Sequence, residues 1–265
     1  MVSNNNGHSP SVKPQLGVGF NRALPAPFGF DNGIKMDGVN DLYIIPLLNT
    51  GTFTFPVNWS FEMWLVYNNE SYNQYMADFF GAYNTTNVRR LRVFHFQTGR
   101  LGIEFNGETA IVGYFNIGLN HIVCSFDGTK GSLYINTVMV STNNWNTVTP
   151  APPAGLSVSS FSQPPASGYG STPIKHDELR FYSVGLTPAQ VQRNYNSGVG
   201  ENPFETENLM LWYKYQQFET LDFSALQDGS DMRLGIRDYS SKKYHAAPLN
   251  MQTTVGAAGY PFVPF

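Results

Sequence analysis

Residues 177–198 read DELRFYSVGLTPAQVQRNYNSG, and this stretch decides the fold class of the chain. Its first half predicts a strand, because Leu179 and Phe181 share one face and the residues that alternate with them share the other. Its second half predicts one short helix near residues 188–197. A single short helix in a chain of strand and turn patterns has to pack on a larger β structure.

The start of this helix is marked by Thr187, Pro188 and Gln190. Thr187 is a natural N-cap, Pro188 suits the first helical position, and Gln190 completes a capping box. Gly198 is expected to end the helix, because glycine readily adopts the left-handed conformation that follows many helices.

Most of the remaining chain predicts short strands separated by turns that are rich in Gly, Asn and Pro. Residues 28–46 predict a hairpin, and residues 59–67 alternate so that Trp59 and Phe61 face the core. The other predicted strands are residues 75–82, 89–97, 100–106, 109–112, 120–127, 133–135, 138–140 and 156–160. This spacing predicts an all-β, antiparallel β-sandwich.

Composition limits the classes of function. The chain has 265 residues, which is enough for one large β domain, and only 13% of them are charged while 15% are aromatic. The formal net charge of −3 leaves no electrostatic footprint for nucleic acid. The single cysteine, Cys124, excludes an intrachain disulfide, so we expect the chain to fold in a reducing cytoplasm or without dependence on oxidation.

The opening residues and the apolar runs show no targeting pattern. MVSNNNGHSP has neither a basic region nor an apolar region, so we expect no secretory signal. No run approaches the roughly 18 apolar residues of a membrane helix, so we expect no membrane span.

Four segments, taken in order, resemble laminin-G-like domains with the concanavalin A-like jelly-roll fold. They are residues 30–44 (FDNGIKMDGVNDLYI), 59–65 (WSFEMWL), 121–136 (HIVCSFDGTKGSLYIN) and 177–198. The resemblance extends over about residues 28–198 and implies two stacked antiparallel sheets.

Two late segments resemble the part of such domains that usually precedes the opening hairpin. They are residues 209–213 (LMLWY) and 236–249. We interpret this order as a circular permutation, in which residues 208–250 return beside the N-terminal hairpin. The alternative is that these residues pair with a neighbouring subunit by strand exchange.

The predicted organisation has three parts: an extended arm over residues 1–27, a sandwich over 28–250 and an extended tail over 251–265. Prolines in the tail are expected to prevent regular pairing, while its aromatic side chains are poorly placed in water. We therefore expect the arm and tail to dock in grooves of this domain or of a neighbour. The candidate assembly residues are Phe20, Tyr260, Phe262 and Phe265.

The sequence gives no support for catalysis. Glycosidases of this fold carry acidic residues in a Glu-x-Asp-x-Glu type strand, and no segment here has that spacing. There is no Gly-x-Ser-x-Gly elbow, and the five histidines show no spacing typical of metal ligands. We therefore expect the protein not to be an enzyme.

Asp177 is the candidate metal ligand. On the predicted strand it shares the face of Leu179 and Phe181, where an unpaired carboxylate is costly. The resemblance implies that an aspartate at this position can bind a structural Ca²⁺ together with backbone carbonyls. The alternative is that Asp177 lies at the solvated rim of the strand and caps a backbone N–H. No other cofactor is indicated.

A glycan site needs exposed aromatic rings that stack on sugars, with Asn or Asp side chains that bind hydroxyls. Trp145 lies between asparagines in the segment NNWN and is the first candidate, followed by Tyr72 and Tyr169. The alternative for Trp145 is a subunit contact, where tryptophan is also enriched.

Two functional hypotheses follow. The first is a non-enzymatic structural protein of a virus particle: a phage capsid-decoration, head-fibre or tail-associated subunit, made in the host cytoplasm and located in the virion. Its partners would be copies of itself, other virion proteins and glycans. The second is a carbohydrate-binding lectin module of a bacterial surface or polysaccharide-processing system, extracellular or on the cell surface.

Overall fold

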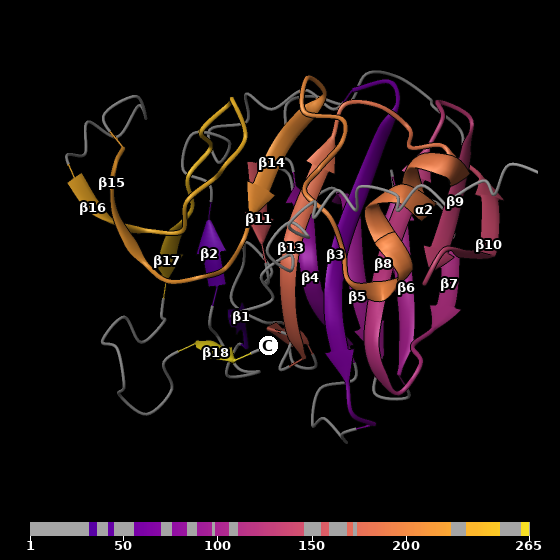
Figure 1. Ribbon diagram of the computed structural model, residues 1–265, viewed down its shortest axis with the longest axis horizontal. Helices are drawn as coiled ribbons and strands as arrows, with labels where there is room; N and C mark the ends of the chain where they lie inside the picture. The colour runs from indigo at the N-terminus through magenta and orange to yellow at the C-terminus, as the bar shows by residue number, and fades with distance from the viewer. Residues whose placement is uncertain are drawn as a thin grey trace, which may run out of the picture.

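The computed structural model describes residues 32–35, 42–44, 56–69, 76–83, 89–96, 99–105, 111–145, 155–158, 169–171, 174–223, 232–249 and 261–264. Within these residues the chain forms two stacked β-sheets (Figure 1). Each pair of neighbouring strands in the described residues is antiparallel, apart from β12 and β4. The predicted antiparallel sandwich is therefore confirmed.

The first sheet has the spatial order β10-β9-β8-β3-β13-β1-β18, and β14 also pairs with β13. Its strands are β1 (Asn32–Ile34), β3 (Trp59–Tyr67), β8 (Gly118–Phe126), β9 (Lys130–Ile135), β10 (Val138–Asn144), β13 (Lys175–Tyr182), β14 (Leu209–Tyr213) and β18 (Phe262–Pro264).

The second sheet has the order β17-β2-β11-β4-β5-β6-β7, and β12 pairs with β4. Its strands are β2 (Leu42–Ile44), β4 (Met76–Tyr83), β5 (Arg89–Phe96), β6 (Arg100–Phe105), β7 (Ile111–Tyr114), β11 (Gly155–Val158), β12 (Tyr169–Ser171) and β17 (Ala247–Leu249). A separate two-stranded sheet contains β15 (Glu219–Asp222) and β16 (Met232–Gly235).

The core lies between the two large sheets and follows the alternation in the sequence. Trp59, Phe61, Met63 and Leu65 of β3 all point into it and are fully buried. The residues of β3 that point to the opposite face, such as Glu62, are equally buried, because other parts of the chain cover the outer side of this sheet.

Helix α2 (Pro188–Tyr195) lies across the outer side of the first sheet (Figure 1). The predicted capping box is present, with the Thr187 side chain accepting the Gln190 N–H and the Gln190 side chain accepting the Thr187 N–H. The α-helix ends earlier than predicted, at a left-handed Asn196, and a 3₁₀ turn (η1, Asn196–Gly198) carries the chain on to Gly198. Among the described residues, no helix is long and apolar enough to cross a bilayer.

The predicted hairpin over residues 28–46 is wrong. β1 pairs with β13 and β18 in the first sheet, whereas β2 pairs with β11 and β17 in the second. The chain therefore passes from one sheet to the other between these strands. A local turn signal predicts a change of direction and carries no information on strand partners.

The late strands pair within this chain. β14 pairs with β13, and β17 pairs with β2, so both large sheets include strands from residues 209–249. This is the arrangement that the permutation hypothesis expects. The C-terminal tail also pairs, because β18 joins β1 with Pro264 opposite Asn32, which corrects the expectation that its prolines prevent regular pairing.

Candidate functional site

The outer side of the first sheet carries a buried polar network centred on Glu62. Its carboxylate accepts hydrogen bonds from Arg180, at 3.0 Å, and from Tyr182, at 2.8 Å. His121 Nε2 lies 2.9 Å from the same carboxylate, and the Asn194 amide of α2 donates to it at 2.8 Å. The network therefore holds the helix against the sheet.

The charge state of Glu62 follows from these partners. Burial by itself would raise its pKa, but the Arg180 guanidinium and the hydrogen bonds from His121 and Tyr182 lower the pKa to about 2. Glu62 is thus an ionised structural carboxylate with its lone pairs occupied.

A β-bulge lies beside this network. The pairing of β13 with β3 shifts between Asp177 and Arg180, and Glu178 has a positive φ of 52°. Asp177 therefore pairs with Trp64, on the outer side, so its predicted place on the Leu179 and Phe181 face is wrong. The extra residue reverses the alternation, and the sequence has no local signal for it.

Asp177 and Glu178 do not fit the calcium site that the resemblance implied. Asp177 is buried; its Oδ1 accepts the Glu178 N–H at 2.7 Å, and its Oδ2 has no hydrogen-bond partner. The positive charges of Arg180 and Lys214 already act on these carboxyl groups, and they would repel a Ca²⁺ ion. The described residues hold no group of three or more His, Cys, Asp or Glu side chains that could bind a metal.

A partly exposed aromatic surface continues from the network, and we name it the platform: Trp212, Lys214, Glu219, Arg237 and Tyr239. The ring centroids of Trp212 and Tyr239 are 5.8 Å apart at 57°. Lys214 Nζ lies 4.4 Å from the Trp212 centroid and 5.2 Å from that of Tyr239. Tyr239 is 41% exposed, so its ring is open to a ligand.

Asp238 joins the backbones of the two segments that carry these rings. Its Oδ1 accepts the Trp212 and Ser240 N–H groups at 2.8 Å, and its Oδ2 accepts the Tyr244 N–H at 2.8 Å. The Tyr239 N–H in turn donates to the Trp212 carbonyl. Burial raises the pKa of Asp238, and these hydrogen bonds oppose the rise. The Asp238 carboxylate therefore holds the backbone at Trp212 to the loop that follows Tyr239.

Polar groups surround the rings. The Arg237 guanidinium donates to Glu219 Oε2, with Nε at 2.7 Å, and the Tyr239 hydroxyl donates to Glu219 Oε1 at 3.4 Å. The Trp212 indole N–H donates to Glu178, which fixes the orientation of that ring. Aromatic faces bordered by a carboxylate and cations provide the contacts that bind sugars: rings stack on C–H faces, and charged groups bind hydroxyls.

The structure places the predicted glycan residues elsewhere. Trp145 is 1% exposed and stacks on Trp59 at 6.1 Å inside the core, so it offers no ring to a glycan or to another subunit. It occupies the space above Gly131, where a Cβ atom would lie 2.4 Å from the indole. Tyr169 lies in β12, but its side chain is outside the described residues, and so is all of Tyr72.

Most of the assembly residues also lie outside the described residues: Phe20, Tyr260 and Phe265. Phe262 belongs to β18, and only its backbone is described. Their roles in assembly stay predictions.

Sequence reasoning missed the platform. It predicted the strand of Trp212 and the segment of Tyr239, but neither residue was a candidate for binding. Strand alternation could have found Trp212, because Leu211 and Tyr213 face the core and leave Trp212 on the outer side. Only the fold brings Tyr239 beside it.

A match to a known protein family identifies the family of this chain. The model of the concanavalin A-like lectin/glucanases superfamily matches residues 40–192. No curated protein sequence is significantly similar to this chain.

Two solved structures are similar to this chain at low sequence identity. A candidate carbohydrate-binding protein of Bacteroides ovatus has a TM-score of 0.57 and 13% identity over 82% of this chain, which spans 58% of that protein. A heptameric SAP-like pentraxin of Limulus polyphemus has a TM-score of 0.49 and 14% identity, over 65% of this chain and 85% of the pentraxin. At this identity the likeness concerns the fold alone. Because the family model matches more than half of its residues, the chain belongs to the concanavalin A-like lectin/glucanases superfamily.

Proposed function

We propose that the protein is a non-enzymatic carbohydrate-binding module and that the platform is its sugar-binding surface. The observation that carries this proposal is the Trp212–Tyr239 pair, whose backbone segments are joined through Asp238 and whose rings are bordered by Glu219 and Arg237. The family and the carbohydrate-binding description of the Bacteroides ovatus protein support it.

The network near the platform supports binding over catalysis. Glu62 and Glu178 are almost fully buried, and both are engaged with Arg180. A glycosidase needs two carboxyl groups that face one sugar bond, and these two face the protein interior. We therefore propose no hydrolytic role for them.

The virion hypothesis is the weaker of the two. Neither the family nor the similar structures point to a phage, so a role as a capsid, fibre or tail subunit stays a prediction. A carbohydrate-binding module would act outside the cell or on a cell surface.

A glycan array tests the proposal. Tyr239→Ala and Trp212→Ala should each weaken binding to the recognised glycans about tenfold or more, since each removes a stacking ring. Tyr114→Ala is the matched control, because Tyr114 is 65% exposed but lies on β7, at the far edge of the second sheet. Binding that survives both platform variants would place the sugar site elsewhere.

A further inference from the structure

Lys214 has an unusual position in the platform. Its ammonium lies against both rings, 4.4 Å from the Trp212 centroid and 5.2 Å from the Tyr239 centroid, and the side chain is partly buried. Among the described residues, no carboxylate lies within ion-pairing distance of it. A cation that lies against two aromatic faces without a direct ion pair is available to a negative charge on a ligand.

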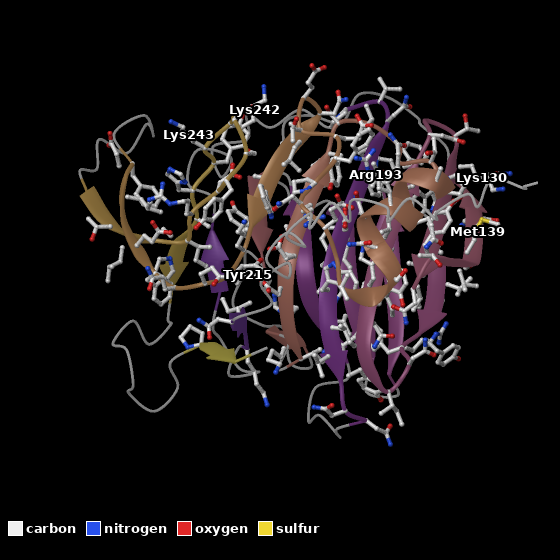
Figure 2. All side chains as sticks on the ribbon, in the orientation of Figure 1. Lys130, Met139, Arg193, Tyr215, Lys242 and Lys243 are labelled. Carbon is white, nitrogen blue, oxygen red and sulfur yellow. The ribbon has the colours of Figure 1, made fainter. Side chains whose placement is uncertain are left out.

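Further positively charged side chains lie on the segment that carries Tyr239. Arg237 is paired with Glu219, whereas Lys242 and Lys243 are exposed on the loop that follows Tyr239 (Figure 2). Burial and the charges of Arg237 and Lys243 lower the pKa of His245, and the charges of Glu219 and Asp222 oppose this shift.

The acids beneath the platform do not neutralise Lys214 by direct contact. Glu178 accepts from Arg180 and from the Trp212 indole. Burial raises the pKa of both Glu178 and Asp177, and the charge of Lys214, which acts on both acids without touching them, opposes the rise. The oxygens of Asp238 are occupied by backbone and hydroxyl donors.

The ammonium covers part of both rings, so a sugar of any kind stacks on the ring surface that it leaves uncovered, and a neutral sugar gains no ion pair there. A sugar with an anionic group can leave the ammonium in place, pair with it and stack on the remaining ring surface. We propose that the platform binds acidic sugars, which carry a carboxylate or a sulfate, and that Lys214 is the residue that selects them. This inference rests on the proposed function and names its ligand class.

Titration calorimetry with three tetrasaccharides tests it: tetragalacturonate, its methyl ester and a sulfated heparin tetrasaccharide. The ester matches the first probe without its charge. The heparin probe carries both sulfates and carboxylates, so its comparison with tetragalacturonate shows whether sulfate is required. At least one anionic probe should bind about tenfold tighter than the ester, which corresponds to one charge-assisted contact. Lys214→Gln should remove this difference, and Lys214→Arg should keep it.

Lys130→Gln is the matched control, because Lys130 is exposed on β9 at the opposite end of the molecule (Figure 2). Equal binding of the ester and the acids, an unchanged Lys214→Gln variant, or no binding of any probe would each overturn the inference. So would equal, Lys214-dependent binding of duplex DNA, which would indicate nonspecific attraction of polyanions.

The two proposals fail separately. If neutral glycans on the array bind and Tyr239→Ala abolishes that binding, the proposed function stands while the acidic ligand class fails. If no glycan depends on Tyr239 or Trp212, both fail.

Discussion

Glu62 and Asp177 lie on the same outer side of the first sheet and show two outcomes of burying a carboxylate. Glu62 accepts from Arg180, Tyr182 and Asn194, and its pKa falls to about 2. Asp177 has one oxygen without a partner, and burial followed by the charge of Glu178 raises its pKa well above the usual range. Ionisation therefore stabilises the fold at Glu62 and opposes it at Asp177.

Replacing each of the two acids by its amide should change the free energy of unfolding by different amounts. Glu62→Gln leaves the Arg180 charge buried without its main partner and should lower the free energy of unfolding at pH 7 by about 3–5 kcal/mol. Asp177→Asn keeps the acceptor for the Glu178 N–H and removes a poorly paired acid, so the loss should be less than about 1 kcal/mol. Urea unfolding measures both, and equal losses would contradict this assignment of roles.

Among the elements, α2 covers the Glu62 network, and its first turn depends on Thr187. Thr187→Ala removes the side-chain acceptor for the Gln190 N–H and should cost about 1 kcal/mol of stability. Thr187→Ser keeps that acceptor and should be nearly neutral. The comparison is made by thermal or urea unfolding; an alanine variant as stable as the serine variant would show that the cap contributes nothing.

The loop that carries Tyr239 should depend on Asp238. Asp238→Asn removes one of the two oxygens that bind the Trp212, Ser240 and Tyr244 N–H groups. We expect a loss of about 1–3 kcal/mol and faster hydrogen exchange at the Tyr244 amide.

Glu219→Gln is the control for this loop, because Glu219 forms a partly exposed ion pair with Arg237. Such pairs contribute about 1 kcal/mol or less. A larger loss in Glu219→Gln than in Asp238→Asn would mean that the surface pair, and not the buried Asp238 carboxylate, holds the loop.

Elements that follow a simple period could be predicted from the sequence. The alternation from Trp59 to Tyr67 gave the correct inward face, and the capping box gave the correct helix start. Features that depend on partners could not be predicted: the bulge that moves Asp177 to the outer side, and the separation of β1 and β2 into different sheets. The platform belongs to this second class, because strand pairing brings Tyr239 to Trp212.

At the scale of the whole molecule, acid should weaken the fold through two buried groups in different pH ranges. Burial lowers the pKa of His176 to about 4, and its partners lower that of Glu62 to about 2. The folded chain prefers the neutral form of His176, and this preference contributes fully to stability above the unfolded pKa of about 6.5. The contribution is lost as the pH falls toward 4. The ionised Glu62 stabilises fully above about 4.5, and its contribution is lost between there and about 2.

Differences between wild type and variants isolate these ranges, because the raised pKa values of Asp177, Glu178 and Asp238 act in the opposite direction and cancel in the comparison. The stability advantage of wild type over His176→Gln should shrink by about 3 kcal/mol between pH 7 and pH 4, and its advantage over Glu62→Gln should shrink by a similar amount below pH 4.5. Urea unfolding at closely spaced pH values measures both. If either advantage stayed constant across its range, the group would have the same pKa in the folded and unfolded chains, and its burial would have no electrostatic consequence for the sandwich.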